Sequence, residues 1–412
     1  MSSDMKDDQE QENIEREWAG VLGSVSKWVS SLKDGEDPSM PKEESDSIPY
    51  LGVLTSGKNI RNLAAQNPHY RLKKLAEANK EVKLHLFFFS AKGIDVEKKQ
   101  ISGMYYDFSE MEWKQNTFPY PHYLLRRGGI AKKYKERFRT FLSQSEEENM
   151  TRLNPSTLGN WKVYHYFRTV PSLENYLQET IISSKPSDLF HMLYRHPHVY
   201  LKGLTGRKGK NVIRVERTRG NNYHLFRYNA SRKNVDTLVF VNYQELMFYV
   251  TRFYKGKKFM IQEGIDLLEI KNRRIDVRAE LQRNEKDKII IRGISARIGR
   301  ANSPITTHAE AVKIDHLFGM VNISQEEKDR LVKEIETFLL HVYQETEKKF
   351  CTFAEMGIDF AIDKAHNIKF IECNSSSTKV SLLNAYGEET LEVSMKMVLL
   401  YVKHLYSKRM RF

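Results

Sequence analysis

Apolar residues in the first 47 positions recur at spacings of three and four within an otherwise polar stretch rich in Asp, Glu and Ser. Such spacing predicts one face of an amphipathic helix inside a mostly disordered leader (1–47). The pattern leaves two interpretations open, because the 14–32 helix either docks on a partner protein or packs on its own chain. Its apolar face consists of Ile14, Trp18, Val21, Val25, Trp28 and Leu32.

Residues 48–150 show strand and helix patterns in turn. A short apolar run at 48–54 is followed by a helical pattern at 71–79 and by a second apolar run at 82–90. This β-α-β order predicts a small α/β domain, which continues through two further apolar stretches and ends in polar sequence near 150. Nothing in this zone suggests catalysis by itself.

The zone 151–412 is richer in strand patterns, and its helices do not alternate strictly with them. One helix is predicted from 388 to 406, and another begins at Ser324, where Glu327 completes a capping-box pattern. This order indicates an α+β fold rather than a doubly wound sheet. The predicted strands are 199–202, 212–216, 259–263, 275–281, 289–298, 357–362 and 368–374.

Composition narrows the class of protein. The 412 residues have a formal charge of +13, but residues 1–47 hold 13 acidic and 5 basic residues, so the remainder carries +21. A basic body favours anionic partners such as nucleotides. Only Cys351 and Cys373 are present, which excludes a disulfide scaffold and a cysteine-built zinc cluster. No membrane span and no signal peptide are predicted, so we expect a soluble, cytoplasmic protein.

The stretch 357–374 alternates on both sides of a polar turn, as a β-hairpin does. If the turn is 364–367, Asp359 lies directly opposite Glu372, and Asn374 shares the face of Glu372. Two opposed carboxylates repel, and a divalent cation removes that conflict. These oxygen ligands suit Mg²⁺ or Mn²⁺. The alternative is an exposed hairpin face with two solvated acids, and the apolar neighbours favour the metal site.

A glycine-rich basic segment follows the predicted strand that ends at Lys202. Gly203, Gly206 and Gly209 allow backbone N–H groups to approach phosphate oxygens, and the lysine adds positive charge. The spacing does not match a Walker loop, and a plain hairpin turn is the commoner explanation of such glycines. Together with a metal site downstream, the segment indicates nucleotide binding.

Two further stretches place polar residues on predicted strands. Gln262 and Glu263 end an apolar strand and are suited to hold an adenine edge. Asp276 and Arg278 share one strand face, and Arg297 lies on a later strand. Guanidinium groups in a sheet suit a phosphate or a tetrahedral intermediate, although these residues taken alone favour a structural ion pair.

The order of these parts resembles an ATP-grasp enzyme, and most closely the YheC/YheD endospore coat-associated family. The resemblance covers nearly the whole chain after the leader. Its last motif, Gly-x-Asp followed by Glu-x-Asn at 357–374, is shared with glutathione synthetase-like ligases. The resemblance implies an ATP-grasp domain over 151–412, in which two α+β subdomains clasp ATP, preceded by a small α/β domain over 48–150.

The resemblance also implies a reaction. A carboxylate would be activated as an acyl phosphate and then attacked by an amine or a thiol, in a spore-forming bacterium and linked to its spore coat. The cofactors would be ATP and Mg²⁺ or Mn²⁺. The implied roles are phosphate binding for Lys162, Lys202 and the flap 203–209, adenine binding for Gln262 and Glu263, γ-phosphate or acyl-phosphate contact for Arg278 and Arg297, and Mg²⁺ binding for Asp359, Glu372 and Asn374.

Two other functions stay open at this point. The segment 304–310 lacks the Asn and paired glycines often seen in the family, which favours a non-catalytic coat-assembly protein that keeps the fold. The basic body and the aromatic-basic run 223–233 favour a nucleic-acid binder, whose mark is steeply salt-dependent binding. Solvated basic faces are common, so the expected partners are ATP, a carboxylate and an amine rather than nucleic acid.

Overall fold

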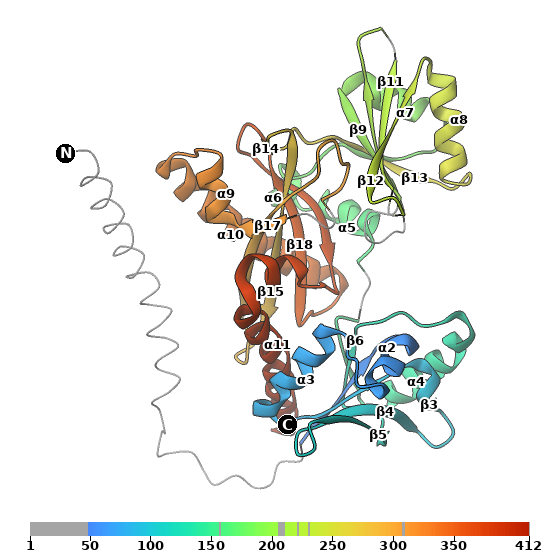
Figure 1. Cartoon of the computed structure of the whole chain (residues 1–412), viewed down its shortest axis with the longest axis vertical. Coiled ribbons are helices and arrows are strands. Elements are labelled where there is room, and N and C mark those ends of the chain that lie inside the picture. The colour runs from blue at the N-terminus through green and yellow to red at the C-terminus, as the bar shows by residue number, and fades with distance from the viewer. Residues whose placement is uncertain are drawn as a thin grey trace, which may run out of the picture. The chain divides into compact units, whose positions relative to one another are not determined.

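The computed structural model describes residues 48–155, 158–204, 211–220, 222–229, 231–306 and 310–411. These residues form three β-sheets with helices packed on them (Figure 1), as expected for an α+β fold. The leader (1–47) and its predicted 14–32 helix lie outside the described residues.

The N-terminal sheet has the strand order β3-β4-β2-β1-β6-β7, with β5 paired to β4. β1 runs parallel to β2, as the predicted β-α-β order requires. Helices α2 (Gly57–Ala64) and α3 (Tyr70–Val82) pack on one face, and α4 (Lys135–Glu147) packs on the other. The strands are β1 (Tyr50–Leu54), β2 (His85–Phe89), β3 (Ile94–Asp95), β4 (Gln100–Asp107), β5 (Glu112–Pro119), β6 (Tyr123–Arg126) and β7 (Thr151–Leu153).

The middle sheet has the order β12-β11-β10-β9-β13-β8. Helices α7 (Ser187–Arg195) and α8 (Tyr243–Phe253) cover one face. Tyr223 and Leu225, from the run that suggested nucleic-acid binding, are buried in this core. The strands are β8 (Thr180–Ile182), β9 (His198–Gly203), β10 (Val212–Arg217), β11 (Tyr223–Asn229), β12 (Asn234–Phe240) and β13 (Phe259–Glu263).

The C-terminal sheet has the order β17-β16-β15-β18-β19, with β14 paired to β15. Its apolar face packs on α5 (Asn160–Phe167), α6 (Pro171–Glu174), α9 (Ile314–Met320) and α10 (Gln325–Phe350). The strands are β14 (Glu269–Ile270), β15 (Arg273–Arg283), β16 (Ile289–Ile298), β17 (Glu310–Lys313), β18 (Glu355–Ile362) and β19 (Ile368–Asn374).

Helix α10 begins where the capping pattern predicts. The Ser324 hydroxyl accepts a hydrogen bond from the backbone N–H of Glu327. The second half of the predicted capping box is absent among the described contacts, because the Glu327 carboxylate binds Arg330 at 2.7 Å and lies 3.0 Å from His366 Nδ1. The helix start is therefore confirmed, and the reciprocal bond of the box is not formed.

The last helix, α11 (Val380–Met410), connects the C-terminal sheet with the N-terminal one. It breaks at Gly387, whose φ of 83° lies outside the helical region, so the predicted 388–406 helix is its second segment. In the first segment the Tyr386 hydroxyl donates to the carbonyl of Ile294 in β16 at 2.9 Å. In the second, Leu391 and Val398 join the core around α3, and Figure 1 shows the two helices side by side.

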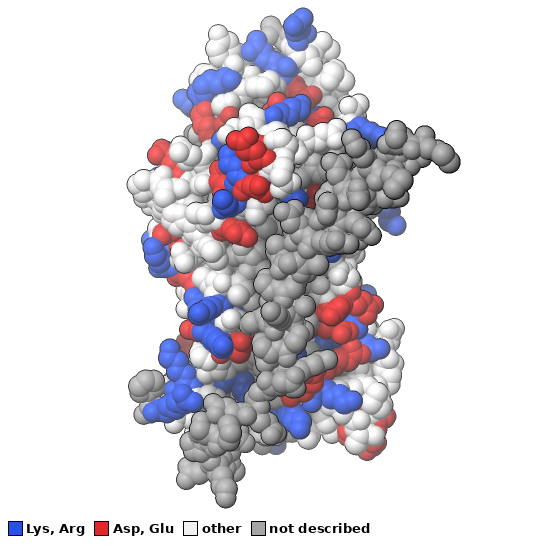
Figure 2. Space-filling view, turned by 90° about the vertical axis from the view of Figure 1, so that its left-hand side faces the viewer, with Lys and Arg blue, Asp and Glu red and all other residues white. Residues whose placement is uncertain are grey.

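Two further observations concern the charge on the surface and the apolar character of the helices. On the face that Figure 2 shows, basic side chains lie among acidic ones over the described residues. The net positive charge of residues 48–412 is therefore not concentrated in a single basic patch on this face. None of the helices in the described part of the chain combines the length and apolar character that a bilayer crossing requires.

Candidate active site

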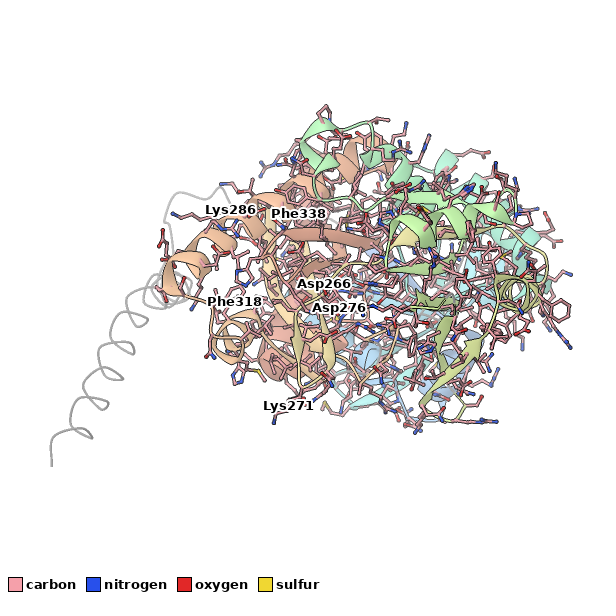
Figure 3. All side chains as sticks on the ribbon, turned by 90° about the horizontal axis from the view of Figure 1, so that it is seen from above. Asp266, Lys271, Asp276, Lys286, Phe318 and Phe338 are labelled. Atoms are coloured by element: carbon pink, nitrogen blue, oxygen red, sulfur yellow. The ribbon has the colours of Figure 1, made fainter. Side chains whose placement is uncertain are left out.

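Strand β15 separates an apolar layer from a polar one. Val277 and Ala279 are buried in the core with Phe338 of α10, whereas Asp276 and Arg278 project from the opposite face. Figure 3 shows Phe338 and Asp276 apart from each other. Period-two alternation along the strand produces this separation, so the predicted common face of Asp276 and Arg278 is confirmed.

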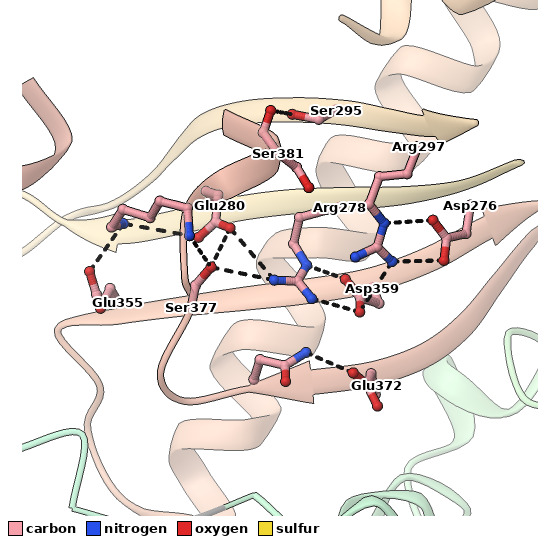
Figure 4. A network of polar contacts seen from close by, with 12 residues as sticks. Asp276, Arg278, Glu280, Ser295, Arg297, Glu355, Asp359, Glu372, Ser377 and Ser381 are labelled. Carbon is pink, nitrogen blue, oxygen red and sulfur yellow. Dashed lines mark hydrogen bonds and ion pairs between the residues drawn. The ribbon is translucent and has the colours of Figure 1, made fainter. Parts of the chain in front are cut away.

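Two arginines and two aspartates from three adjacent strands form a continuous ion-pair network (Figure 4). Arg278 donates to both carboxylate oxygens of Asp359, with Nη2 at 2.7 Å from Oδ2. Arg297 donates to both oxygens of Asp276 at 2.6 and 2.7 Å, and its Nη2 lies 3.3 Å from Oδ2 of Asp359. Bidentate pairs fix the plane of a guanidinium group, so both arginines are held in one orientation beside Asp359.

The β18–β19 hairpin carries the predicted carboxylate pair. Asp359 lies directly opposite Glu372, which confirms the predicted register at this pair. A β-bulge between Asp359 and Phe360 shifts the register on the side of the turn. Ile362 therefore pairs with Ile368, whereas the predicted register pairs it with Lys369. The turn is closed by a bond from Asp363 N–H to the Asn367 carbonyl, which leaves 364–366 as the turn and makes the assumed 364–367 one residue too long.

The two opposed carboxylates differ in their environments. Burial alone would raise the pKa of Asp359, but the neighbouring Arg278 and Arg297 guanidinium groups hold it at about 2. Burial, together with the charge of Asp359, raises the pKa of Glu372 above its usual range. Within the described residues, Glu372 forms no ion pair with a guanidinium group and instead accepts a hydrogen bond from the Asn374 amide at 3.1 Å. Glu372 is therefore the member of the pair without a guanidinium partner in the described part of the chain.

The middle sheet contributes Lys202 from the face opposite α7 and α8. Its Nζ donates to Oε1 of Gln262 at 2.6 Å, and Nε2 of Gln262 donates to the Thr180 hydroxyl at 3.0 Å. Burial lowers the pKa of Lys202, although Glu372 and Asp359 act in the opposite direction. The charges of Glu372 and Asp359 in the C-terminal sheet therefore act on this lysine of the middle sheet.

The other predicted nucleotide-binding residues are placed differently. Glu263 accepts a hydrogen bond from the backbone N–H of Glu179 at 3.0 Å. Gly203 is the last residue of β9, whereas Gly206 and Gly209 lie outside the described residues. Lys162 is exposed on α5 and does not join the network around Arg278 in the described part of the chain. The roles of these residues in binding nucleotide stay predictions.

Comparison with known proteins establishes the family. A family model described as YheC/D-like ATP-grasp matches residues 149–405. The chain belongs to this family. The endospore coat-associated protein YheD of Bacillus subtilis (strain 168) is 22% identical over 336 residues, which cover 79% of this chain and 72% of YheD.

Solved structures support the ATP-grasp fold. The ATP-grasp ligase PsnB in complex with a phosphomimetic variant of its minimal precursor, Mg and ADP is similar with a TM-score of 0.51 and 10% identity, over 86% of this chain and 100% of PsnB. PsnB with its minimal precursor has a TM-score of 0.50 and 11% identity, over 85% and 99%. The predicted α+β ATP-grasp fold is thereby confirmed.

The residues of this YheC/D-like ATP-grasp chain fit a hard divalent cation. In the described residues no group of three or more His, Cys, Asp or Glu is arranged to hold a metal, so the Asn374 amide oxygen has to serve as the third donor beside Asp359 and Glu372. Carboxylate and amide oxygens are the ligands that Mg²⁺ prefers. A cation here would favour the ionised form of Glu372 and would share Asp359 with Arg278.

Sequence reasoning missed one residue that contacts the pair directly. Asn160, at the start of α5, donates from its side-chain amide to Oε2 of Glu372 at 3.2 Å. A hydrogen bond of this kind orients a carboxylate for metal binding. The sequence indicates Lys162, two positions later, because its charge suits a phosphate. A single Asn at the start of a helix gives no such indication.

Sequence reasoning also missed a second buried network behind Arg278 (Figure 4). Lys379, at the start of α11, has its Nζ 3.1 Å from Oε2 of Glu355 and 4.0 Å from Oε2 of Glu280. Arg127, which follows β6, pairs with Glu355, and Ser377 donates to Glu280. Burial would raise the pKa of Glu355, but Arg127 and Lys379 hold it at about 2.

Proposed function

We propose that this chain is an ATP- and Mg²⁺-dependent ligase that joins a carboxylate to an amine or a thiol through an acyl phosphate. ATP with Mg²⁺ would supply the phosphoryl group that activates the carboxylate. Membership of the YheC/D-like ATP-grasp family supports the proposal.

The observation that carries the proposal is the convergence of three cations and an opposed carboxylate pair. The charges of Asp359 and Glu372 act on Lys202 of the middle sheet, and Arg278 and Arg297 stand beside Asp359 in the C-terminal sheet. A purely structural network would pair both carboxylates with cations, whereas Glu372 has no ion-pair partner among the described residues. Preorganised cations stabilise charge that develops during phosphoryl and acyl transfer.

Each residue has a proposed task. Asp359, Glu372 and Asn374 would hold Mg²⁺, and Arg278 and Arg297 would face the transferred phosphoryl group or the acyl phosphate. Because Asp359 and Asp276 already orient both guanidinium groups, little reorganisation would be needed when substrate binds. The further proposed contacts to nucleotide are those of Lys162, Lys202, Gly203, Gly206 and Gly209 with the phosphates and of Gln262 and Glu263 with adenine.

We also propose a link to the spore coat, which rests on the similarity to the endospore coat-associated protein YheD. A cytoplasmic location and a protein partner for the 14–32 helix stay predictions.

Calorimetric titration with a non-hydrolysable ATP analogue, with and without Mg²⁺, tests the proposal. We expect micromolar binding that requires Mg²⁺ and weakens at least tenfold in Lys202→Met, because the variant loses a half-buried positive charge on which the carboxylate pair acts. Lys185→Met, which removes an exposed lysine of the same subdomain, is the matched control and should bind as the wild type does. No detectable binding by the wild type would contradict the proposal.

A further inference from the structure

A cavity of about 640 Å³ opens on the N-terminal sheet, away from the candidate active site. It lies where β2 and β4 separate, since the described residues pair these strands only at Phe88 and Met104. The absence of a side chain at Gly103 permits that contact, because a Cβ there would lie 3.0 Å from the Phe88 carbonyl oxygen. Beyond this point the strands diverge and leave the cavity open to one side.

Aromatic rings line this cavity. Tyr50 and His85 stack with their ring centres 4.5 Å apart, and Tyr105 meets Phe118 edge to face at 6.1 Å. Tyr50, Tyr105 and Phe118 pack at the edge of the core under α4 but are only half-buried, and His85 is exposed. Flat rings left accessible in a concave site are suited to hold apolar or aromatic groups of a ligand.

The cavity is also positively charged. Lys80 and Lys83 line it, and its described lining contains no Asp or Glu. Nearby acids are engaged elsewhere, since Glu81 pairs with Lys396 of α11 and Asp107 lies 3.0 Å from Lys114. Neither Lys80 nor Lys83 forms an ion pair within the described ranges, so both are available to an anionic ligand.

We propose that this cavity is a docking site for an acidic peptide bound in an extended conformation. Alternate side chains of an extended peptide point to opposite sides, so apolar ones can lie on the rings while acidic ones reach the lysines. Asn116 and Thr117, which also line the cavity, offer donors and acceptors to a peptide backbone. An acidic peptide also presents carboxylates of the class that the ligase would activate, and this last link alone rests on the proposed function.

Fluorescence anisotropy of a labelled peptide of alternating Glu and Tyr tests the docking site. The full chain is used without nucleotide, so a failure of the ATP proposal does not affect the result. We expect saturable binding that weakens at least tenfold in Lys80→Glu/Lys83→Glu, because two attractive charges become repulsive. The matched control, Lys58→Glu/Lys98→Glu, reverses two exposed lysines of the same domain outside the cavity and should stay within twofold of the wild type.

A second variant separates the aromatic contribution from the charge. Tyr105→Ala should weaken binding of the Glu–Tyr peptide several-fold while leaving the salt dependence of binding unchanged. Equal weakening in both double-lysine variants would overturn the proposal, because the effect would then be one of net charge. Tighter binding of polygalacturonate or of a single-stranded oligonucleotide than of the peptide would also overturn it, in favour of an acidic sugar or a nucleic acid.

Discussion

The buried network behind Arg278 makes a quantitative prediction for Lys379→Met. Lys379 pairs with the carboxylates of Glu355 and Glu280. All three side chains are almost completely shielded from solvent. Methionine also has a long side chain, and it adopts this left-handed backbone conformation (φ 54°) no less readily than lysine does. The substitution therefore removes the charge with little change in shape, and leaves Arg127 as the principal cation beside Glu355.

Removing one partner of a buried charge network typically costs about 3–5 kcal/mol, because the remaining charge stays desolvated. With an unfolding entropy of about 2.1 cal/mol/K per residue over residues 48–412, this corresponds to a melting temperature lowered by about 4–7 °C. The exposed pair of Lys364 and Asp266, at 3.0 Å, provides the control, and Lys364→Met should cost less than about 1 kcal/mol.

The pH dependence distinguishes this account from a packing defect. In the wild type the pKa of Glu355 is held at about 2, so its stabilising contribution is present above the ordinary carboxyl pKa and is lost as pH falls towards 2. In Lys379→Met the Glu355 pKa rises, and the acid becomes neutral at a higher pH. Thermal unfolding followed by circular dichroism should therefore show a larger deficit at pH 7 than at pH 4. A deficit below about 1 kcal/mol at pH 7, or one independent of pH, would refute the reasoning.

Two further substitutions test local geometry. Gly264→Ala should destabilise the chain by about 1–3 kcal/mol in urea unfolding, because the new Cβ would lie about 2.0 Å from the His198 ring; unchanged stability would show that the ring has room to move. Asn160→Ala should weaken Mg²⁺-dependent binding of an ATP analogue about tenfold while leaving the melting temperature nearly unchanged, because it removes the hydrogen bond that orients Glu372; unaltered Mg²⁺ dependence would contradict that role.

Local pattern was sufficient for the elements that carry the site. Alternation around one polar turn placed Asp359 opposite Glu372, and the strand bounds around Arg278 and Arg297 agree with the sequence pattern within a few residues. The bulge beside Asp359 was not predictable, because an alternating pattern does not indicate which residue is left unpaired between two strands. The turn was consequently misjudged by one residue, although the functional pair was not.

Contacts between distant segments could not be predicted from a single sequence. Nothing near Glu280, Glu355 or Lys379 indicates that they meet, because their pairing depends on how α11 returns to the sheet. In the aromatic-basic run 223–233, composition alone did not indicate which residues are buried. Tyr223 and Leu225 belong to a run whose aromatic and basic residues suggested nucleic acid, yet they form the core of the middle sheet.

The most direct test of the central claim, that Asp359 and Glu372 hold Mg²⁺ together with a bound nucleotide, is a Mg²⁺ titration of ADP binding. Calorimetry on the wild type and on Glu372→Gln should show nucleotide affinity that rises with Mg²⁺ only in the wild type. Glu285→Gln, in the turn between β15 and β16, serves as the control and should behave as the wild type does. The same Mg²⁺ dependence in Glu372→Gln as in the wild type would contradict the claim.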